Sequence, residues 1–268
     1  MGPCTVSYYD AGTGTCVILA HCSSASHKMW VPLMTELEGQ HRILAPDLIG
    51  YGRSERWPPG QKFDPALDAE VLVRLAHIAD GPVHIAAHSY GAAVALEAAR
   101  RIGDQVISLT LIEPVAFHVL PQAGRMEEWG EISAIADGVW RAASNGADRA
   151  AAGIYMRFWI GRVRWLLMPK RQRSWIVDTV GKVAAEFDGM RRVSTSVQEY
   201  EQVRAPTALI VGGRTRRPAR AVIEVLAHTL PKAHVHVLPT AGHMSPFTHG
   251  EQVRGAIVEH INRHEPAR

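Results

Sequence analysis

The sequence lacks the features that mark several specialised classes of protein. It has only 3 cysteines in 268 residues, with no CxxC pair, so reduced thiols in a cytoplasmic protein are the simplest interpretation. Its formal net charge is +3 and its basic residues form no continuous tract, which argues against a nucleic-acid partner. Its longest apolar runs are too short to span a bilayer, and its first residues lack a signal-peptide pattern, so we expect no membrane partner.

What remains is an ordinary globular composition. Hydrophobic residues make up 47% of the chain and charged residues 21%. A chain of this length can form one large α/β domain that carries an insertion. The sequence predicts no metal site and no cofactor, and it leaves a homodimer open.

Strand-like and helix-like segments alternate along most of the chain. The strand-like segments are residues 6–10, 15–20, 42–46, 83–86, 106–112, 208–211 and 235–238. The helix-like segments between them are residues 30–37, 67–78, 91–101, 219–229 and 252–263. This alternation predicts an α/β fold with a doubly wound, mostly parallel sheet.

The alternation stops between residues 113 and 205, where no buried-type strand is found. Helical spacing instead predicts helices near residues 127–143, 147–167 and 171–190, in a segment that holds five of the seven tryptophans. We therefore divide the chain into an α/β core, residues 1–114 and 205–268, and a helical cap, residues 115–204. The cap is expected over the carboxyl edge of the sheet, where α/β proteins bind ligands.

Residues 87–91 read Ala-His-Ser-Tyr-Gly and join a predicted strand to a helix of small residues. A sharp turn in this context lifts a serine side chain above the sheet edge and aims the amino end of the helix at the reacting centre. Small residues are needed two positions before and after that serine. Gly91 and Ala87 meet this need, so Ser89 is the candidate nucleophile.

Two further loops carry candidate functional groups. His243 follows the last predicted strand, where its imidazole can take a proton from a serine. In the loop after residues 15–20, the backbone N–H of Ser23 can join that of Tyr90 to hold an oxyanion. Cys22 lies in the same loop, but nothing near it in the sequence indicates an activated thiol.

Together these pieces resemble the α/β-hydrolases, in the subset that carries a cap. The matching motifs are His21-Cys22-Ser23, residues 47–54, residues 87–91 and Gly242-His243, and they follow the family's order over nearly the whole chain. The resemblance implies an eight-stranded, mostly parallel sheet, a Ser-acid-His triad and acyl-transfer chemistry. The chain departs from the family at Cys22 and Ala87, where glycine is usual.

The acid of the triad is absent from its usual place. The family places it after the strand at residues 208–211, yet no Asp or Glu lies between Ala205 and Val222, and Thr215 occupies the expected position. Glu113, at the end of the strand at residues 106–112, is the best candidate; certain haloalkane dehalogenases and zearalenone-lactone hydrolases keep the acid there. The alternative is a glutamate that caps a helix or pairs with an arginine of residues 214–217.

We therefore expect a serine hydrolase that cleaves a small-molecule carboxylic ester or lactone, with Ser89 as nucleophile, His243 as base and Glu113 as acid. Cys22, His118 and Met244 are candidates for the pocket. A serine at this position argues against dehalogenase chemistry, whereas carbon–carbon bond hydrolysis uses the same triad. A non-catalytic ligand sensor with a hydrolase fold is the alternative from another class.

Overall fold

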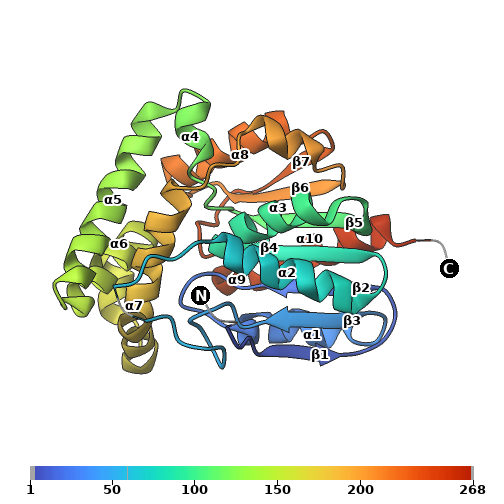
Figure 1. Ribbon diagram of the computed structural model, residues 1–268, viewed down its shortest axis with the longest axis horizontal. Helices are drawn as coiled ribbons and strands as arrows, with labels where there is room; N and C mark the ends of the chain where they lie inside the picture. The colour runs from blue at the N-terminus through green and yellow to red at the C-terminus, as the bar shows by residue number, and fades with distance from the viewer. Residues whose placement is uncertain (1–3, 59, 267–268) are drawn as a thin grey trace.

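A computed structural model describes residues 4–58 and 60–266. Its seven strands form one sheet in the order β1-β3-β2-β4-β5-β6-β7 (Figure 1). The strands are β1 (Tyr8–Ala11), β2 (Cys16–Ala20), β3 (Arg42–Pro46), β4 (Val83–His88), β5 (Val106–Ile112), β6 (Thr207–Gly212) and β7 (Ala233–Leu238). Only β1 runs antiparallel to its neighbour, so the predicted doubly wound, mostly parallel sheet is confirmed.

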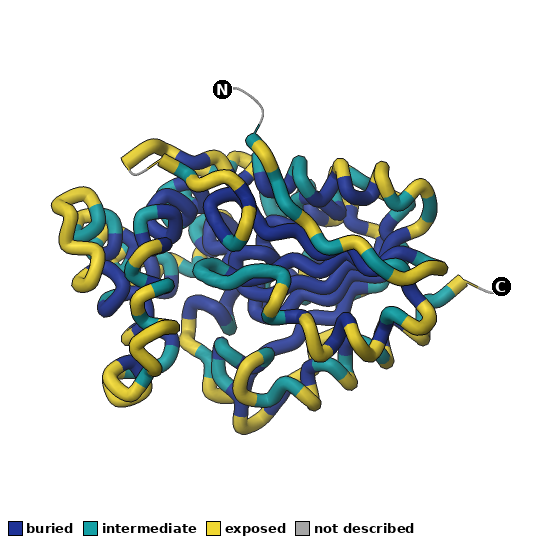
Figure 2. Tube along the Cα trace, turned by 90° about the horizontal axis from the view of Figure 1, so that it is seen from below, coloured by how far each residue is buried: buried dark blue, intermediate teal, exposed yellow. Residues whose placement is uncertain are grey.

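Helices cover both faces of this sheet. They are α1 (Val31–Leu37), α2 (Ala66–Ala79), α3 (Tyr90–Ile102), α8 (Arg217–Thr229), α9 (Ser245–Thr248) and α10 (Gly250–His264). Alternate side chains of β2 point to opposite faces: Ile18 belongs to the buried cluster that includes residues of α2, α3 and α8, whereas Val17 and Leu19 belong to the cluster that includes residues of α1 and α10. The strands β2 to β6 therefore lie buried between two helical layers, whereas the edge strands β1 and β7 are largely exposed (Figure 2).

The resemblance implies eight strands. This expectation is wrong for the described residues, which form seven. The backbone just before β1 bonds to the loop after β3: the Asp47 N–H donates to the Ser7 carbonyl at 2.9 Å, and the Glu55 N–H donates to the Thr5 carbonyl at 2.9 Å. These bonds occupy the backbone groups that a further strand would need for a ladder.

A helical insertion, residues 115–204, separates β5 from β6. Its helices are α4 (Val119–Gln122), α5 (Met126–Ser144), α6 (Asp148–Leu167) and α7 (Lys170–Arg191). Helices α5 to α7 pack side by side at one end of the sheet, at the left of Figure 1. The three long helices that the sequence predicts are thus present, and the boundaries of the two domains stay a prediction. No described helix has both the length and the apolar character to cross a membrane.

The connection from β4 to α3 depends on a close approach of two backbones. A Cβ atom on Gly91 would lie 2.3 Å from the His21 carbonyl oxygen and 2.8 Å from that of Ala20, at the end of β2. Both atoms belong to backbone that is held in the sheet and its loop, so neither can move aside easily. Only glycine therefore lets α3 start this close to β2.

Gly91→Ala should destabilise the fold by about 1–3 kcal/mol, because the added methyl group overpacks this contact. The matched control is Gly181→Ala on α7, where an added Cβ meets no atom within 4 Å. That change should be neutral or stabilise by up to about 1 kcal/mol through helix propensity. Urea unfolding of both variants measures the difference, and equal effects would contradict the packing argument.

Candidate active site

Ser89 sits in a strained turn between β4 and α3. Its φ of 57° and ψ of −118° lie outside the common regions for a residue with a side chain. The Ser89 N–H donates to the Ile112 carbonyl at 2.9 Å, which ties the turn to the end of β5. This geometry is typical of a nucleophilic serine that stands at the carboxyl edge of a parallel sheet.

The structure brings the three predicted side chains into one hydrogen-bonded chain. Ser89 Oγ lies 2.9 Å from His243 Nε2, and His243 Nδ1 lies 2.7 Å from Glu113 Oε2. The three residues are 4%, 3% and 0% exposed. They come together because β4, β5 and β7 are parallel, so the residues that follow these strands meet at one edge.

Glu113 is held as a carboxylate by several donors. The Gly212 N–H donates to its Oε1 at 2.8 Å, and the Thr215 hydroxyl donates to its Oε2. Burial by itself would raise the pKa of Glu113, but the hydrogen bonds from His243, Thr215 and Gly212 outweigh burial and lower it. Thr215, at the family's usual acid position, thus supports the carboxylate from the loop after β6.

Two aromatic residues hold His243 in place, one at its ring and one at its backbone. Trp159 of α6 stacks on it, with ring centroids 3.6 Å apart and an angle of 20° between the planes. His88 donates from Nε2 to the His243 carbonyl at 2.8 Å. Burial lowers the pKa of His88 to about 3, so this second imidazole is neutral and serves as a donor.

The loop that follows β2 is fixed by His21. Its Nε2 accepts the Leu48 N–H at 2.9 Å, so its Nδ1 carries the proton and donates to the Cys22 carbonyl at 2.7 Å. Burial lowers the pKa of His21 to about 4, which keeps this tautomer neutral. Among the described residues the N–H groups of Ser23 and Tyr90 have no hydrogen-bond acceptor, and Tyr90 is the first residue of α3.

A small, largely apolar pocket lies beside Ser89. Its lining residues are Ser23, Ser89, Tyr90, Val115, Phe117, Tyr155, Trp159, Val183, Glu186, Phe187 and Met190. Most of them come from the insertion, which therefore supplies much of the wall. Apolar walls with a few polar groups at one end suit a small organic ligand.

Within the described part of the chain, the pocket lining does not include the three other predicted pocket residues. Cys22 is buried, and burial raises the pKa of its thiol to about 12, so the thiol is not an activated nucleophile. His118 instead contacts the Tyr200 hydroxyl at 2.9 Å. Met244 follows His243 and is half-buried.

The glycine-containing loop at residues 47–54 forms a structural turn. Asp47 Oδ2 accepts the Arg53 N–H at 2.8 Å, and Asp47 Oδ1 accepts the His27 N–H at 2.9 Å. The missing side chain of Gly52 makes room for this carboxylate, since a Cβ there would lie 2.1 Å from it. The Asp47 carboxylate therefore holds one backbone N–H of the turn and that of His27, which is a structural role.

Sequence reasoning missed two features of the site. Trp159 is one of five tryptophans in the insertion, and no local pattern singles it out. Lys182 and Glu186 stand at i and i+4 of α7, which in a sequence resembles an ordinary surface ion pair. In the structure both are buried, and Glu186 lines the pocket.

The comparisons with known proteins assign the class. The model of the Alpha/beta hydrolase family matches residues 17–256, so the chain belongs to this family.

Individual relatives are more distant. The chain is 24% identical over 94% of its length to the dihydrolipoyllysine-residue acetyltransferase component of an acetoin cleaving system from Pseudomonas putida, and spans 64% of that protein. It is 36% identical to the lipase LipV of Mycobacterium tuberculosis, over 37% of the chain and 36% of the lipase. A solved thermophilic esterase from Thermogutta terrifontis is similar at a TM-score of 0.77 and 25% identity, with 98% of this chain and 95% of that one covered.

The lowered pKa of Glu113 predicts a pH dependence of stability. A carboxyl group whose pKa falls on folding stabilises the fold above its unfolded-state pKa, and this contribution is lost as the pH falls through the folded-state pKa. The free energy of unfolding of the wild type should therefore exceed that of Glu113→Gln most near neutral pH, and the gap should narrow below about pH 4. Urea unfolding between pH 7 and pH 3 measures it, and a constant gap would contradict this assignment.

Proposed function

We propose that the protein is a serine hydrolase that cleaves a carboxylic ester or lactone through an acyl-enzyme. The observation that carries the proposal is the continuous chain of hydrogen bonds from Ser89 through His243 to Glu113, in a pocket beside the helical insertion. The likeness to an esterase and, over a shorter segment, to a lipase supports the same reaction class.

In the proposed first step, His243 takes the proton of Ser89 as Oγ attacks the ester carbonyl. The N–H groups of Ser23 and Tyr90 donate to the oxygen that becomes negative. Collapse of this intermediate breaks the carbon–oxygen bond, and His243 gives its proton to the leaving alcohol. Glu113 keeps Nδ1 of His243 protonated and stabilises the imidazolium while it exists.

In the proposed second step, His243 takes a proton from a water molecule, whose oxygen attacks the acyl carbon. The intermediate releases the carboxylic acid, and the proton returns to Ser89 Oγ. The apolar wall formed by Val115, Phe117, Trp159 and Val183 favours an uncharged acyl or alcohol group over a charged one. We also propose a cytoplasmic location, because the 3 cysteines, without a CxxC pair, suit reduced thiols.

Two other functions use the same residues differently. A carbon–carbon bond hydrolase would share the triad but need a carbonyl substrate with a carbon leaving group. A ligand sensor would bind its ligand in the same pocket without converting it to a product. The Ser89–His243 contact at 2.9 Å and the carboxylate behind it favour an active nucleophile over the sensor.

A fluorophosphonate probe should label the wild type and fail to label Ser89→Ala, since it reacts with an activated serine. Glu113→Gln should lower kcat for a chromogenic ester about 10³–10⁴-fold, because the imidazole loses its orientation and its counter-charge. A panel of 4-nitrophenyl esters and lactones of graded size then defines the substrate. A folded wild type that is never labelled would favour the sensor, and Glu113→Gln with wild-type turnover would refute the acid assignment.

A further inference from the structure

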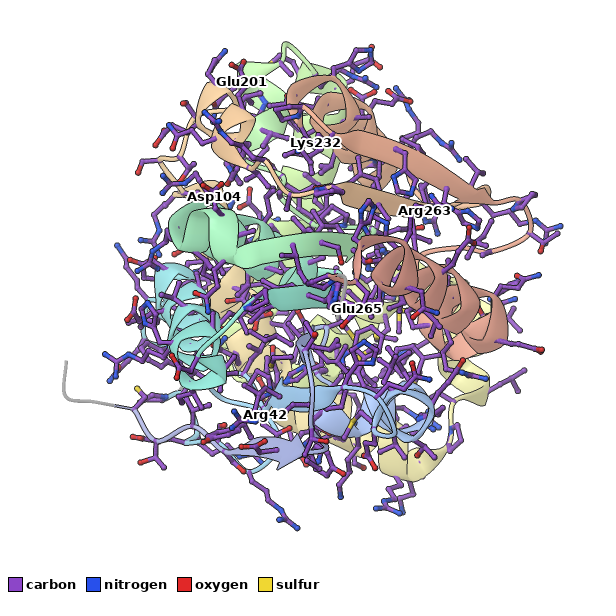
Figure 3. All side chains as sticks on the ribbon, turned by 90° about the vertical axis from the view of Figure 1, so that its right-hand side faces the viewer. Arg42, Asp104, Glu201, Lys232, Arg263 and Glu265 are labelled. Atoms are coloured by element: carbon purple, nitrogen blue, oxygen red, sulfur yellow. The ribbon has the colours of Figure 1, made fainter. Side chains whose placement is uncertain are left out.

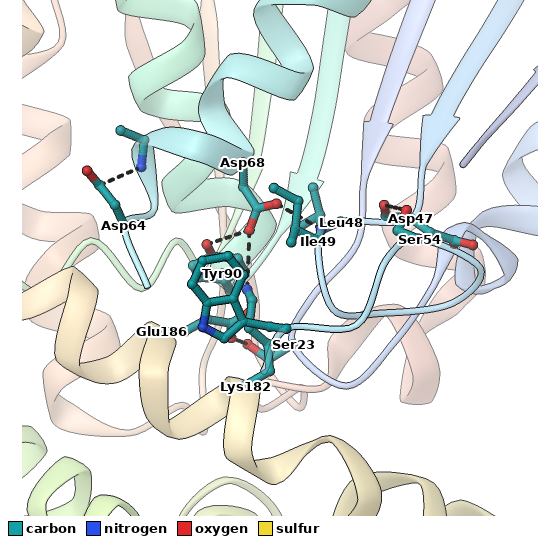
Figure 4. A network of polar contacts seen from close by, with 12 residues as sticks. Ser23, Asp47, Leu48, Ile49, Ser54, Asp64, Asp68, Tyr90, Lys182 and Glu186 are labelled. Atoms are coloured by element: carbon teal, nitrogen blue, oxygen red, sulfur yellow. Dashed lines mark hydrogen bonds and ion pairs between the residues drawn. The ribbon is translucent and has the colours of Figure 1, made fainter. Parts of the chain in front are cut away.

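Three ionisable side chains are buried together where α7 meets the core (Figure 4). Lys182 Nζ donates to Glu186 Oε1 at 2.9 Å and to Asp68 Oδ2 at 3.4 Å. The side chains of Lys182, Glu186 and Asp68 are 3%, 3% and 0% exposed. Removing charges from water is costly, and an apolar packing of the same volume would avoid that cost. Such a group of charges is therefore a candidate for a role beyond packing.

The two ends of this cluster reach the two residues that are proposed to bind the oxyanion. The Ser23 hydroxyl donates to Glu186 Oε2 at 2.5 Å, and the Tyr90 hydroxyl donates to Asp68 Oδ2 at 2.7 Å. With Lys182 in the middle, a continuous polar chain joins the side chains of both residues (Figure 4). Their backbone N–H groups belong to different segments, the loop after β2 and the start of α3.

Lys182 is held firmly in the middle of this polar chain. Its ammonium group lies 3.5 Å from the centre of the Phe63 ring. Its side-chain stem passes beside Gly50, where an added Cβ would lie 3.0 Å from Lys182 Cγ. The second oxygen of Asp68 accepts the Ile49 N–H at 2.9 Å. A displacement of α7 would therefore move Lys182 and, through the cluster, the side chains of Ser23 and Tyr90.

We propose that Lys182 and Glu186 are positioning residues of the hydrolase, which align the N–H groups of Ser23 and Tyr90 on the oxyanion and make this alignment depend on the docking of α7. The inference rests on the proposed function and deepens it. The ammonium group also offsets negative charge from Glu186 and Asp68 that would otherwise lie close to the developing oxyanion.

The electrostatics of Glu186 agree with this arrangement. Burial raises the pKa of Glu186, and the neighbouring Lys182 and the Ser23 hydroxyl oppose that rise. Loss of Lys182 would therefore leave a buried carboxyl group that either takes up a proton or turns toward water. Either response breaks the alignment of Ser23.

The test compares Lys182→Met and Ser23→Ala with the wild type on a 4-nitrophenyl ester. Both changes should lower kcat about 10–100-fold, less than the loss of a complete oxyanion donor, because each N–H remains but is displaced. The KM should change less than threefold. Affinity for an alkyl boronic acid, which forms a tetrahedral adduct with the serine, should fall in parallel with kcat.

The matched control is Thr179→Val. The Thr179 hydroxyl lies 2.9 Å from Ser24 Oγ, so it joins the same helix to the same loop without touching the polar chain. It should keep kcat and boronic-acid affinity within threefold of the wild type. If Lys182→Met does not fold, the milder Ser23→Ala, which removes the hydrogen bond from Ser23 to Glu186, tests the inference by itself. Unchanged kcat and adduct affinity in a folded variant, or an equal loss in Thr179→Val, would overturn the inference.

The outcome also separates this inference from the proposed function. Loss of all ester hydrolysis and probe labelling in Ser89→Ala, together with unaffected positioning variants, would refute only the role of Lys182 and Glu186. Ester hydrolysis that persists in Ser89→Ala would refute the proposed function itself, and the inference with it.

A second inference comes from the opposite end of the sheet. His84, in β4, and His41, just before β3, both direct Nε2 at Oε2 of Glu265, at 2.9 Å and 3.2 Å. The three ligand atoms lie within 4.8 Å of one another. Glu265 follows α10, close to the strands of the N-terminal half (Figure 3). Donor atoms around a tetrahedral zinc ion lie roughly 3.3 Å apart, so the two imidazole nitrogens, up to 4.8 Å apart, would move closer together to bind one.

Outer partners orient two of these ligands. Ser108 Oγ lies 2.7 Å from His84 Nδ1, and the Thr15 hydroxyl donates to Glu265 Oε1 at 2.5 Å. Such contacts typically fix metal-binding imidazoles and carboxylates. We infer that His41, His84 and Glu265 form a site for Zn²⁺ that anchors the chain after α10 to the sheet.

Titration of EDTA-treated protein with ZnCl₂ should show one site per chain and a raised Tm. His84→Asn should abolish this site, and Ser108→Ala should weaken it about 10–100-fold. His236→Gln, on the exposed β7, is the control and should bind normally. Visible absorption of bound Co²⁺ should report four-coordinate geometry in the wild type and in His236→Gln, but not in His84→Asn. Absence of saturable binding, or binding that survives in His84→Asn, would leave a hydrogen-bonded cluster and overturn the inference.

Discussion

The close approach of α3 to β2 at Gly91 sets the geometry on which the rest of the site depends. Because no side chain separates the two backbones, α3 begins beside the loop that follows β2. Ser89 is then left with a positive φ, and its side chain stands at the carboxyl edge of the sheet. The same approach places the first N–H of the helix next to the Ser23 loop. The strain is sustained by the buried strands on either side.

Two buried glutamates flank this turn, and their pKa values are shifted in opposite directions. Burial acts to raise the pKa of each, yet the pKa of Glu113 is lowered and that of Glu186 is raised. Glu113 accepts hydrogen bonds from an imidazole, a hydroxyl and a backbone N–H, which together favour the charged form. The rise in the pKa of Glu186 is opposed mainly by the Lys182 ammonium group, which also contacts Asp68. Hydrogen-bond partners, more than burial, thus distinguish the two.

The core elements could be predicted closely because their patterns are local. The helix expected at residues 67–78 spans Ala66–Ala79, and the strand expected at residues 106–112 spans Val106–Ile112. Glu113 could be nominated because the usual position holds Thr215 and the neighbouring strand ends in a carboxylate. The prediction of an eighth strand was wrong for the described residues, because the backbone before β1 bonds to the loop after β3. The role of Lys182 could not be foreseen, because its spacing from Glu186 equally suits a surface pair.

By itself the sequence determined the order of strands and helices, the family, and the positions of Ser89 and His243, since these follow from periodicity and from residues adjacent to strand ends. The tertiary structure alone decided which side chains share a buried environment. Parallel strands bring Glu113 to His243 across 130 residues, and the docking of α7 brings Lys182 and Glu186 to Ser23 and Asp68. Such contacts depend on how layers pack against one another, and no local stretch of sequence carries that information.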